Sequence, residues 1–478
     1  MRILAFFRKE LKKILDGKYV INNNDNVYIN LENGHKYARC GISRGENIIK
    51  YGFPIGHAVC DIKKDEHVHS HNLKTNLADI SSYEYKPDGG CIKKIHCDDT
   101  FMGYIRKDGR AGIRNDIWII NTVGCINKTA EIIAGKTGAL NFPHPFGCSQ
   151  LGDDLDVTQK VLSALVKHPN AGGVLVLGLG CENNNIDLFK KALGSYDKDR
   201  VRFLNSQDST DEISEGVKIV EELKNLASGD VRVPVPISKL TVGLKCGGSD
   251  GYSGITANPL VGRLCDKLVS FGASCVLSEV PEMFGAEEIL MKRCVDKKTF
   301  DKSVKMINNY KEYFISHGQP IYENPSPGNK AGGITTLEEK SLGCVQKGGK
   351  SEVTDVLTYG DTVSKCGLSL LNGPGNDLVA VTNLACSGAN LILFTTGRGT
   401  PFGGPVPTVK ISTNSPLAEK KKNWIDFDAG RVLNPDADAD SVCDELYILV
   451  RDVASGKKCL NEVNGYREIS IFKDGVTL

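Results

Sequence analysis

The glycine-rich segment KCGGSDGYSG, residues 245–254, carries the densest group of reactive side chains in the chain. Lys245, Cys246 and Asp250 lie in it, directly after the apolar run 240–244 and before a helical pattern. A strand, a glycine turn and a helix in this order place the turn at the carboxyl end of a strand, where open α/β sheets bind ligands. A structural turn explains one such segment equally well, but further glycine loops in this chain favour a binding role.

Arg398 stands between two glycines in a second loop of this kind, TGRGTPFGG, residues 396–404. A guanidinium group binds a carboxylate through two hydrogen bonds, and glycine turns expose backbone N–H groups to anions. The loop lacks the Gly-Lys-Ser/Thr ending of a P-loop, and the chain lacks a dinucleotide-binding fingerprint. We therefore expect a small carboxylate ligand rather than a nucleotide. The predicted substrate contacts are Ser249, Asn258, Arg398 and Thr400.

Histidines and carboxylates form a possible metal site. His67, His69 and His71 alternate in HVHSH, so in an extended segment they share one side, and imidazole is the commonest metal ligand. Glu279 and Glu282 follow a predicted buried strand and could hold a divalent ion or act as acid and base. Both groups have plainer interpretations, namely a solvated strand end and charges that complement a helix dipole.

Sixteen cysteines are many, but no secretory signal and no Cys-x-x-Cys pair is present. We therefore expect reduced thiols in a cytoplasmic protein. Several cysteines stand beside glycine in predicted loops. Cys148, Cys181 and Cys246 could together bind a single metal or an iron–sulfur cluster, although an unligated thiol is the safer interpretation for each one alone.

Composition narrows the function classes. The 478 residues contain 59 Lys plus Arg against 58 Asp plus Glu, so no overall charge points to nucleic acid or an anionic membrane. No apolar run approaches the ~20 residues that span a bilayer. Residues 1–18 mix apolar and basic side chains and could form an amphipathic helix, for which local packing is the preferred role.

Strands and helices alternate from residue 103 onward, as at 117–121, 173–178, 274–278 and 390–394, which predicts parallel sheets covered on both faces. Before them come a short β-rich module with a turn at 52–56, and a polar linker. The prolines of 231–237 mark a domain boundary, and 316–350 is expected to be an ordered functional loop. The predicted parts are an extension (1–19), a β module (20–77), a linker (78–102) and two α/β domains (103–232 and 238–478).

Together these segments resemble the altronate/galactarate dehydratase family, from about residue 20 to the C-terminal region, with residues 1–18 and 89–99 outside the resemblance. The matching stretches are YGFPIG (51–56), EHVHSHN (66–72), GYIRKDGRAGIRN (103–115), PHPFGCSQ (143–150), GLGCEN (178–183), 245–254, 323–333 and 395–404. Length and spacing are more similar to the altronate branch than to the galactarate branch.

The resemblance implies an SAF-type β module before two Rossmann-like domains, in a homo-oligomer. It also implies dehydration of a sugar acid to a 2-keto-3-deoxy acid with a divalent metal, iron(II) being favoured over manganese and over an iron–sulfur cluster. A metal bound to the substrate carboxylate stabilises the developing ene-diolate. The implied catalytic residues are Lys245, Asp250 and His71, and the implied metal ligands are His69, His71, Glu279 and Glu282.

Other interpretations remain open. Within the family, the activity could be galactarate dehydration or cleavage of sulfolactate. Outside it, the chain could be a sugar-acid sensor without turnover, although loops offering Lys, Asp, Glu, Arg and Cys exceed what binding needs. A nicotinamide-dependent oxidoreductase is disfavoured because the fingerprint is missing.

Overall fold

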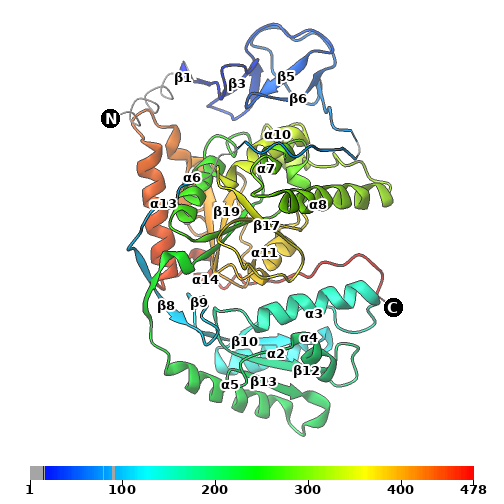
Figure 1. Cartoon of the computed structure of the whole chain (residues 1–478), viewed down its shortest axis with the longest axis vertical. Coiled ribbons are helices and arrows are strands. Elements are labelled where there is room, and N and C mark those ends of the chain that lie inside the picture. Colours follow the sequence, from blue (N-terminus) through cyan, green and yellow to red (C-terminus); the bar gives the residue numbers. More distant parts are fainter. Residues whose placement is uncertain (1–13, 16, 79, 89–91, 478) are drawn as a thin grey trace.

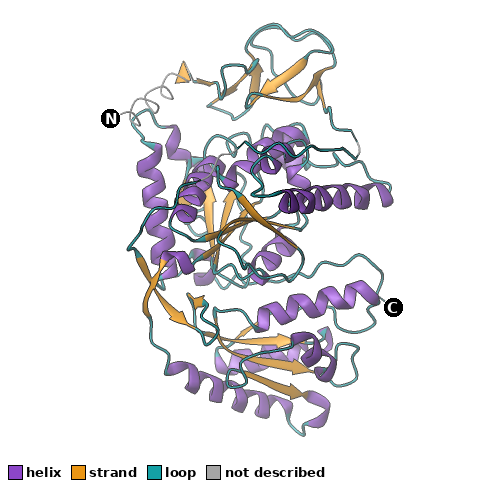
Figure 2. Ribbon diagram, in the orientation of Figure 1, coloured by secondary structure: helices purple, strands orange, loops and turns teal. Residues whose placement is uncertain are grey.

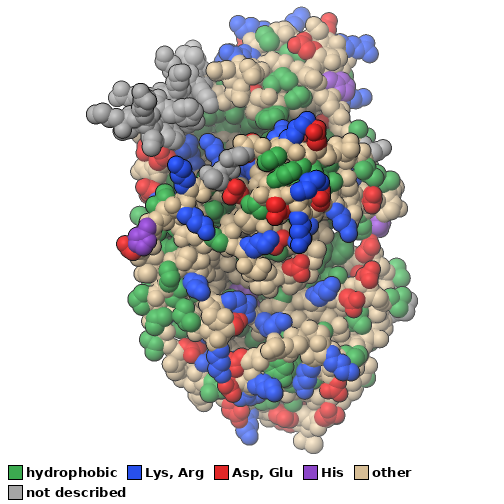
Figure 3. Space-filling view, viewed as in Figure 1, with side chains coloured by type: hydrophobic (Ala, Val, Ile, Leu, Met, Phe, Trp, Pro, Cys, Tyr) green, Lys and Arg blue, Asp and Glu red, His purple; other side chains and the backbone are tan. Residues whose placement is uncertain are grey.

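The computed structural model describes all residues except 1–13, 16, 79, 89–91 and 478, and it shows three parts stacked along the long axis of the molecule (Figure 1). The N-terminal module lies at one end, the C-terminal domain in the middle and the second domain at the other end. On the face shown in Figure 3, acidic and basic side chains are interspersed rather than gathered by sign. None of the helices in the described part is both long and apolar enough to cross a bilayer.

The N-terminal module consists of two small antiparallel sheets. Its strands are β1 (Ile14–Leu15), β2 (Lys18–Tyr19), β3 (Val27–Asn30) and β4 (Lys36–Ala38) in one sheet, and β5 (Asn47–Lys50), β6 (Phe53–Ala58) and β7 (Leu73–Lys74) in the other. Residues 52–56, predicted as a turn, lie mostly in β6. The turn itself is Tyr51–Gly52, where both residues have positive φ. The amphipathic segment predicted at 1–18 falls mostly outside the described residues.

The second domain is a four-stranded parallel sheet with the order β11-β10-β12-β13. Trp118 and Ile120 of β10 pack on the face covered by α3 and α4, whereas Ile117 and Ile119 pack on the face covered by α2 and α5. Both faces of the sheet are buried, which explains why the sequence of β10 is an almost continuous apolar run. The elements are β10 (Asp116–Asn121), α2 (Asn127–Thr137), β11 (Leu140–Asn141), α3 (Gly152–Val166), β12 (Ala171–Gly178), α4 (Ile186–Leu193), β13 (Val201–Asn205) and α5 (Glu212–Ser228).

A three-stranded antiparallel sheet lies between the two α/β domains. It contains β8 (Thr100–Ile105), β9 (Ala111–Gly112) and β14 (Val233–Pro236) in the order β14-β8-β9. The proline-containing β14 is an edge strand, where the missing N–H groups of its prolines cost no ladder bond to a further strand.

The C-terminal domain has a seven-stranded parallel sheet with the order β17-β18-β16-β15-β19-β20-β21. Figure 2 shows strands of this domain with helices around them. Its strands are β15 (Thr241–Cys246), β16 (Ser274–Leu277), β17 (Val353–Leu357), β18 (Gly367–Leu371), β19 (Leu391–Thr396), β20 (Thr408–Ser412) and β21 (Phe427–Asp428). Its helices are α6 (Ala257–Ser270), α7 (Glu287–Met291), α8 (Lys297–Ser316), α9 (Pro327–Ala331), α10 (Leu337–Cys344), α11 (Asp377–Cys386), α12 (Ser415–Lys420), α13 (Ala439–Ala454) and α14 (Leu460–Val463). The β module followed by parallel α/β domains confirms the predicted fold class.

Residues 316–350 are not the irregular loop that the sequence predicts, because they contain α9 and α10. Every residue of α10 is buried, including Glu338, Glu339 and Lys340. A helix that buries charged side chains on all sides through ion pairs lacks the apolar stripe by which a surface helix is recognised.

Candidate functional site

The carboxyl ends of β15 and β16 bring together the residues with the strongest potential for chemistry. These strands are parallel neighbours, so Lys245 and Cys246, which end β15, lie beside Glu279, which follows β16. Glu279 has a φ of 75°, a left-handed conformation that costs a non-glycine residue roughly 1–3 kcal/mol and is typical of functional sites. Glu282 follows in the short 3-10 turn Val280–Met283.

Lys245 and Glu279 form the centre of a dry ion-pair network. Lys245 Nζ lies 2.5 Å from Glu279 Oε1 and 3.0 Å from Asp377 Oδ1, and Lys347 Nζ donates to Glu279 Oε2 at 2.9 Å. The side chains of Lys245, Glu279 and Lys347 are at most 1% exposed. Burial alone would lower the pKa of Lys245, but Glu279 and Asp377 hold it above its usual range. Lys245 is therefore a fixed positive charge in this arrangement.

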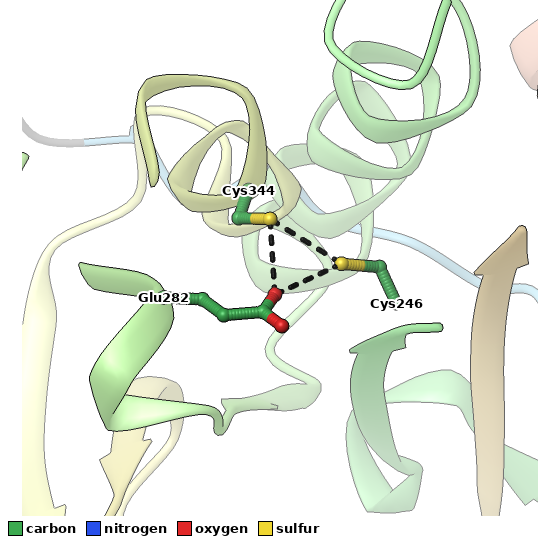
Figure 4. A group of neighbouring side chains, drawn as sticks. All are labelled: Cys246, Glu282 and Cys344. Atoms are coloured by element: carbon green, nitrogen blue, oxygen red, sulfur yellow. Dashed lines mark hydrogen bonds between the residues drawn. The ribbon is translucent and has the colours of Figure 1, made fainter. Parts of the chain in front are cut away.

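Cys246, Glu282 and Cys344 converge beside this pair (Figure 4). The two Sγ atoms are 3.3 Å apart, and they lie 3.2 Å and 3.1 Å from Glu282 Oε2. Cys344 comes from the last turn of α10, so three separate elements supply the group. Within the described ranges this is the one set of three or more His, Cys, Asp or Glu side chains whose ligand atoms all lie within 4.8 Å of one another.

The chemistry of this donor set fits a thiolate-binding divalent metal. Thiolate sulfur favours iron, zinc or copper over magnesium and calcium, and three protein ligands leave a coordination position open. Burial would raise the pKa of Glu282, but Lys340, Lys245 and Lys347 hold it well below its usual range. The pKa of Cys344 is raised by its hydrogen bond with Cys246 and by burial, so metal binding there must release protons.

Two predicted substrate contacts, Ser249 and Asn258, lie beside Cys246 and Cys344. Ser249 Oγ donates to Cys246 Sγ at 3.3 Å. Asn258 receives a hydrogen bond from Thr395 and donates to the Gly343 carbonyl. A small cavity between these residues and Cys344 is also lined by Lys50 and Tyr51 of the N-terminal module.

A larger cleft of about 530 Å³ lies between the N-terminal module and the C-terminal domain. Arg398 lines it with an exposed side chain. Asp250 also lines it, but its carboxylate is held by Thr413 and Asn414, and burial raises its pKa. Thr400 lies outside the cleft lining, where its carbonyl accepts a hydrogen bond from Lys410.

The predicted metal-binding histidines lie in the N-terminal module rather than beside Glu279 and Glu282. His67 Nε2 is 3.0 Å from His35 Nδ1, and His71 is ring-packed against His67. His69 Nε2 donates to the Lys330 carbonyl of α9 at 2.9 Å. The predicted histidine and glutamate ligands are therefore in two places, the histidines in the N-terminal module and the glutamates within the C-terminal domain.

The predicted cysteine set is divided as well. Cys148 and Cys181 lie in the second domain, while Cys246 contacts Cys344 in the C-terminal domain. All cysteines in the described part are free thiols. Sequence analysis missed Cys344, Lys340 and Lys347, which lie in and just after α10. The only signal was the reactive content of EEKSLGC, residues 338–344, in a segment without periodicity.

Comparison with known proteins covers nearly the whole chain. Residues 10–76 match the model of the altronate/galactarate dehydratase SAF domain, 103–228 the second domain of D-galactarate dehydratase/altronate hydrolase, and 237–477 the D-galactarate/altronate dehydratase C-terminal domain. The first match begins at residue 10, so part of the segment expected to lie outside the resemblance is inside it.

Curated relatives include two altronate dehydratases. That of Escherichia coli (strain K12) is 50% identical, covering 98% of this chain and 97% of the relative. That of Bacillus subtilis (strain 168) is 52% identical, covering 94% and 92%. The galactarate dehydratase (L-threo-forming) of Escherichia coli (strain K12) is 31% identical, covering 89% and 86%.

Proposed function

We propose, from the premise that this chain belongs to the galactarate/altronate dehydratase family, that it dehydrates D-altronate to a 2-keto-3-deoxy acid in hexuronate breakdown. The chain is a hydro-lyase that acts on sugar acids. Altronate is preferred over galactarate because identity is about 50% to altronate dehydratases and 31% to the galactarate enzyme. The observation that carries the chemistry is the convergence of Cys246, Glu282 and Cys344 with the Lys245–Glu279 pair.

Iron(II) is the proposed metal, and Cys246, Glu282 and Cys344 would hold it. A thiolate-containing ligand set favours iron over manganese. When bound, the ion supplies a Lewis acid that polarises a substrate oxygen. The histidines of the N-terminal module remain the alternative ligands.

The charged residues around the proposed metal site would bind the substrate and set the electrostatic environment of the reaction. Dehydration removes the proton beside the substrate carboxylate and expels the neighbouring hydroxyl group. Lys245 Nζ donates to Glu279 Oε1 at 2.5 Å, so this pair sets a fixed ammonium charge and a carboxylate side by side next to the proposed metal ligands. Because the pair is almost fully buried, its electrostatic effect is little weakened by water. Arg398, exposed at the cleft, would bind the substrate carboxylate.

Turnover by the full chain, purified without oxygen, tests this proposal. The substrates would be altronate, galactarate and sulfolactate, each with iron(II), manganese or a chelator. We expect 2-keto acid from altronate with iron(II) and its loss with chelator. Sulfite release would reassign the activity to sulfolactate cleavage. Altronate binding without turnover by the metal-loaded chain would favour the sensor.

A matched pair of cysteine variants locates the metal. Cys344→Ser should lose the iron of this site and at least about a hundredfold in kcat/KM, because one of three ligands is replaced. Cys366→Ser is the control, since this exposed thiol of the same domain lies outside the metal-ligand group. Equal iron content and turnover in both variants would refute the assignment.

A further inference from the structure

The turn between β5 and β6 carries a tyrosine in an unusual backbone conformation. Tyr51 has a φ of 62°, and Gly52, which follows it, has a φ of 81°. A bulky residue rarely adopts this left-handed conformation, which persists where surrounding structure enforces it and is common at functional sites. Asp25, which is 3% exposed, enforces it here, because its Oδ1 accepts a hydrogen bond from Gly52 N at 2.8 Å. The turn therefore presents the Tyr51 side chain in one fixed direction.

Two glycines of the C-terminal domain leave room for the Tyr51 hydroxyl group. A Cβ atom at Gly254 would lie 2.0 Å from the hydroxyl oxygen, and one at Gly343 would lie 3.3 Å from it. Gly254 belongs to the loop that follows Cys246, and Gly343 directly precedes Cys344 in α10. The N-terminal module thus inserts a phenol between the two segments that carry the cysteine ligands of the proposed metal site.

The Tyr51 side chain lines the small cavity beside these ligands. The volume of the cavity is about 10 Å³, which is enough for roughly one water molecule or one group of that size. Cys344 lines the cavity directly, and Ser249, another lining residue, donates to Cys246 Sγ at 3.3 Å. The cavity therefore fits a hydroxyl group at the proposed metal site, but not a whole sugar acid.

A whole sugar acid fits the larger cleft instead. That cleft has a volume of about 530 Å³ and is lined by Arg398, the proposed partner of the substrate carboxylate. Asp250 lines both the cleft and the small cavity, so the two spaces are neighbours. The volumes therefore suit a substrate whose chain lies in the cleft and whose hydroxyl group enters the cavity.

Tyr51 is the hydrogen-bond donor that the cavity leaves unused. Its ring is covered by Lys50 Nζ, 5.1 Å from the ring centroid, but no hydrogen bond in the described part of the chain uses its hydroxyl group. Other donors of the lining are engaged, since Lys50 pairs with Glu339, Lys340 with Glu282, and Asn258 with the Gly343 carbonyl. A phenol carries its proton at neutral pH, so Tyr51 has a hydrogen to donate to a ligand.

We propose that Tyr51 is a catalytic residue that donates a hydrogen bond to the hydroxyl oxygen leaving the substrate, an inference that rests on the proposed dehydration. The reaction breaks the C–H bond beside the carboxylate, and its electron pair forms the C=C bond. The neighbouring C–O bond breaks with its electron pair on oxygen, and the proton removed from carbon accounts for the second hydrogen of the water released. Tyr51 keeps its own proton throughout. Its fixed O–H stabilises the negative charge that grows on the leaving oxygen in the transition state.

Tyr51→Phe tests this role, because it removes only the hydroxyl group. Initial rates with altronate and galactarate would be measured on the full chain, purified without oxygen and loaded with iron(II). We expect kcat to fall about a hundredfold to a thousandfold, as when one donor to developing charge is removed. KM should change little, because the hydrogen bond strengthens mainly in the transition state. Iron content should equal that of the wild type, and the melting temperature should be equal or higher, since the hydroxyl group has no protein partner to lose.

Tyr28→Phe is the matched control and should retain kcat. It removes a hydroxyl group from the same module, and that group donates to the exposed Asp65. Equal kcat in Tyr51→Phe and Tyr28→Phe would overturn the inference. Loss of iron or a lower melting temperature in Tyr51→Phe would also overturn it, because the hydroxyl group would then be structural.

The wild type separates this inference from the proposed function. A wild-type chain that dehydrates neither altronate nor galactarate would refute the proposed function and the role of Tyr51 with it. Dehydration at the same rate by the wild type and by Tyr51→Phe would refute the role of Tyr51 alone.

Discussion

The buried triad of Lys36, Glu339 and Lys50 connects the N-terminal module to α10, and Glu339→Gln should release the module. Glu339 forms ion pairs with Lys36 Nζ at 2.8 Å and with Lys50 Nζ at 2.7 Å, and all three side chains are at most 3% exposed. Burial and Glu339 together set the pKa of Lys36 to about 8, while the two ammonium groups hold the pKa of Glu339 well below its usual range. One carboxylate therefore pairs with two buried ammonium groups.

The expected loss of docking free energy follows from the two charges that Glu339→Gln leaves buried without a carboxylate partner. Removing one partner of a buried ion pair costs about 3–5 kcal/mol, because the other charge stays buried without compensation. Glutamine can keep the hydrogen bonds that Glu339 accepts from Thr335, so the loss is mainly electrostatic. At about 1.4 kcal/mol per factor of ten, docking of the module should weaken by roughly a hundredfold to a few thousandfold.

Hydrogen exchange and limited proteolysis measure this release. We expect faster exchange of the amides at the module contact, cleavage in the linker, and loss of turnover, since Lys50 and Tyr51 line the cavity beside Cys344. Asp65→Asn is the control, because the Lys18–Asp65 pair is 45% and 47% exposed and water largely screens such surface pairs.

A rescue variant tests whether the unpaired buried charges, rather than general misfolding, release the module. Combining Glu339→Gln with Lys36→Met and Lys50→Met replaces both lysines with apolar side chains of similar size. This removes the uncompensated charges and should restore most of the docking. If Glu339→Gln showed the same hydrogen-exchange rates and the same protease resistance as Asp65→Asn, the view that this triad holds the module would be wrong.

Two further predictions concern Arg398 and His168. Arg398→Gln should raise KM for the sugar acid by about 10- to 100-fold with little change in kcat, since a charge-assisted hydrogen bond contributes about 1.5–3 kcal/mol; initial rates check this, and a fall in kcat alone would contradict it. His168 is stacked on Trp118, and burial lowers its pKa to about 3. Between pH 6.5 and 3 the unfolded chain binds more protons, so stability falls as pH falls. Denaturation at pH 6.5 and 5 should show His168→Gln losing about 2 kcal/mol less than the wild type, and equal losses would refute a neutral buried imidazole.

Strand positions could be predicted because parallel strands buried on both faces leave short apolar runs. The runs at 240–244, 274–278 and 390–394 correspond to β15, β16 and β19. The same logic predicted that Lys245 and Glu279 lie at a sheet edge, since each directly follows such a run. Side chains at strand ends are visible to sequence analysis because the strand itself fixes their place.

The rest of the site depends on contacts between distant segments. Cys344 lies ninety-eight positions after Cys246, on a helix whose charged residues are buried by partners from the N-terminal module and from the turn after β16. Nothing in the local pattern distinguishes α10 from a polar loop. The histidines do not join Glu279 and Glu282 for the same reason, because contacts with distant segments, such as that of His69 with Lys330, set their position, and the spacing of HVHSH does not reveal these contacts.

Two tyrosines fasten the linker between the module and the rest of the chain to the C-terminal domain. Tyr83 OH donates to Glu287 at 2.6 Å, Lys311 donates to the Tyr83 oxygen, and Tyr85 OH donates to the Cys294 carbonyl. The linker therefore keeps a displaced module close to its docking site, at an effective concentration in the millimolar range that short tethers provide. Return of the module is then a first-order event whose rate does not depend on protein concentration. A module released by Glu339→Gln should therefore dock again at any protein concentration, because the linker prevents its loss by dilution.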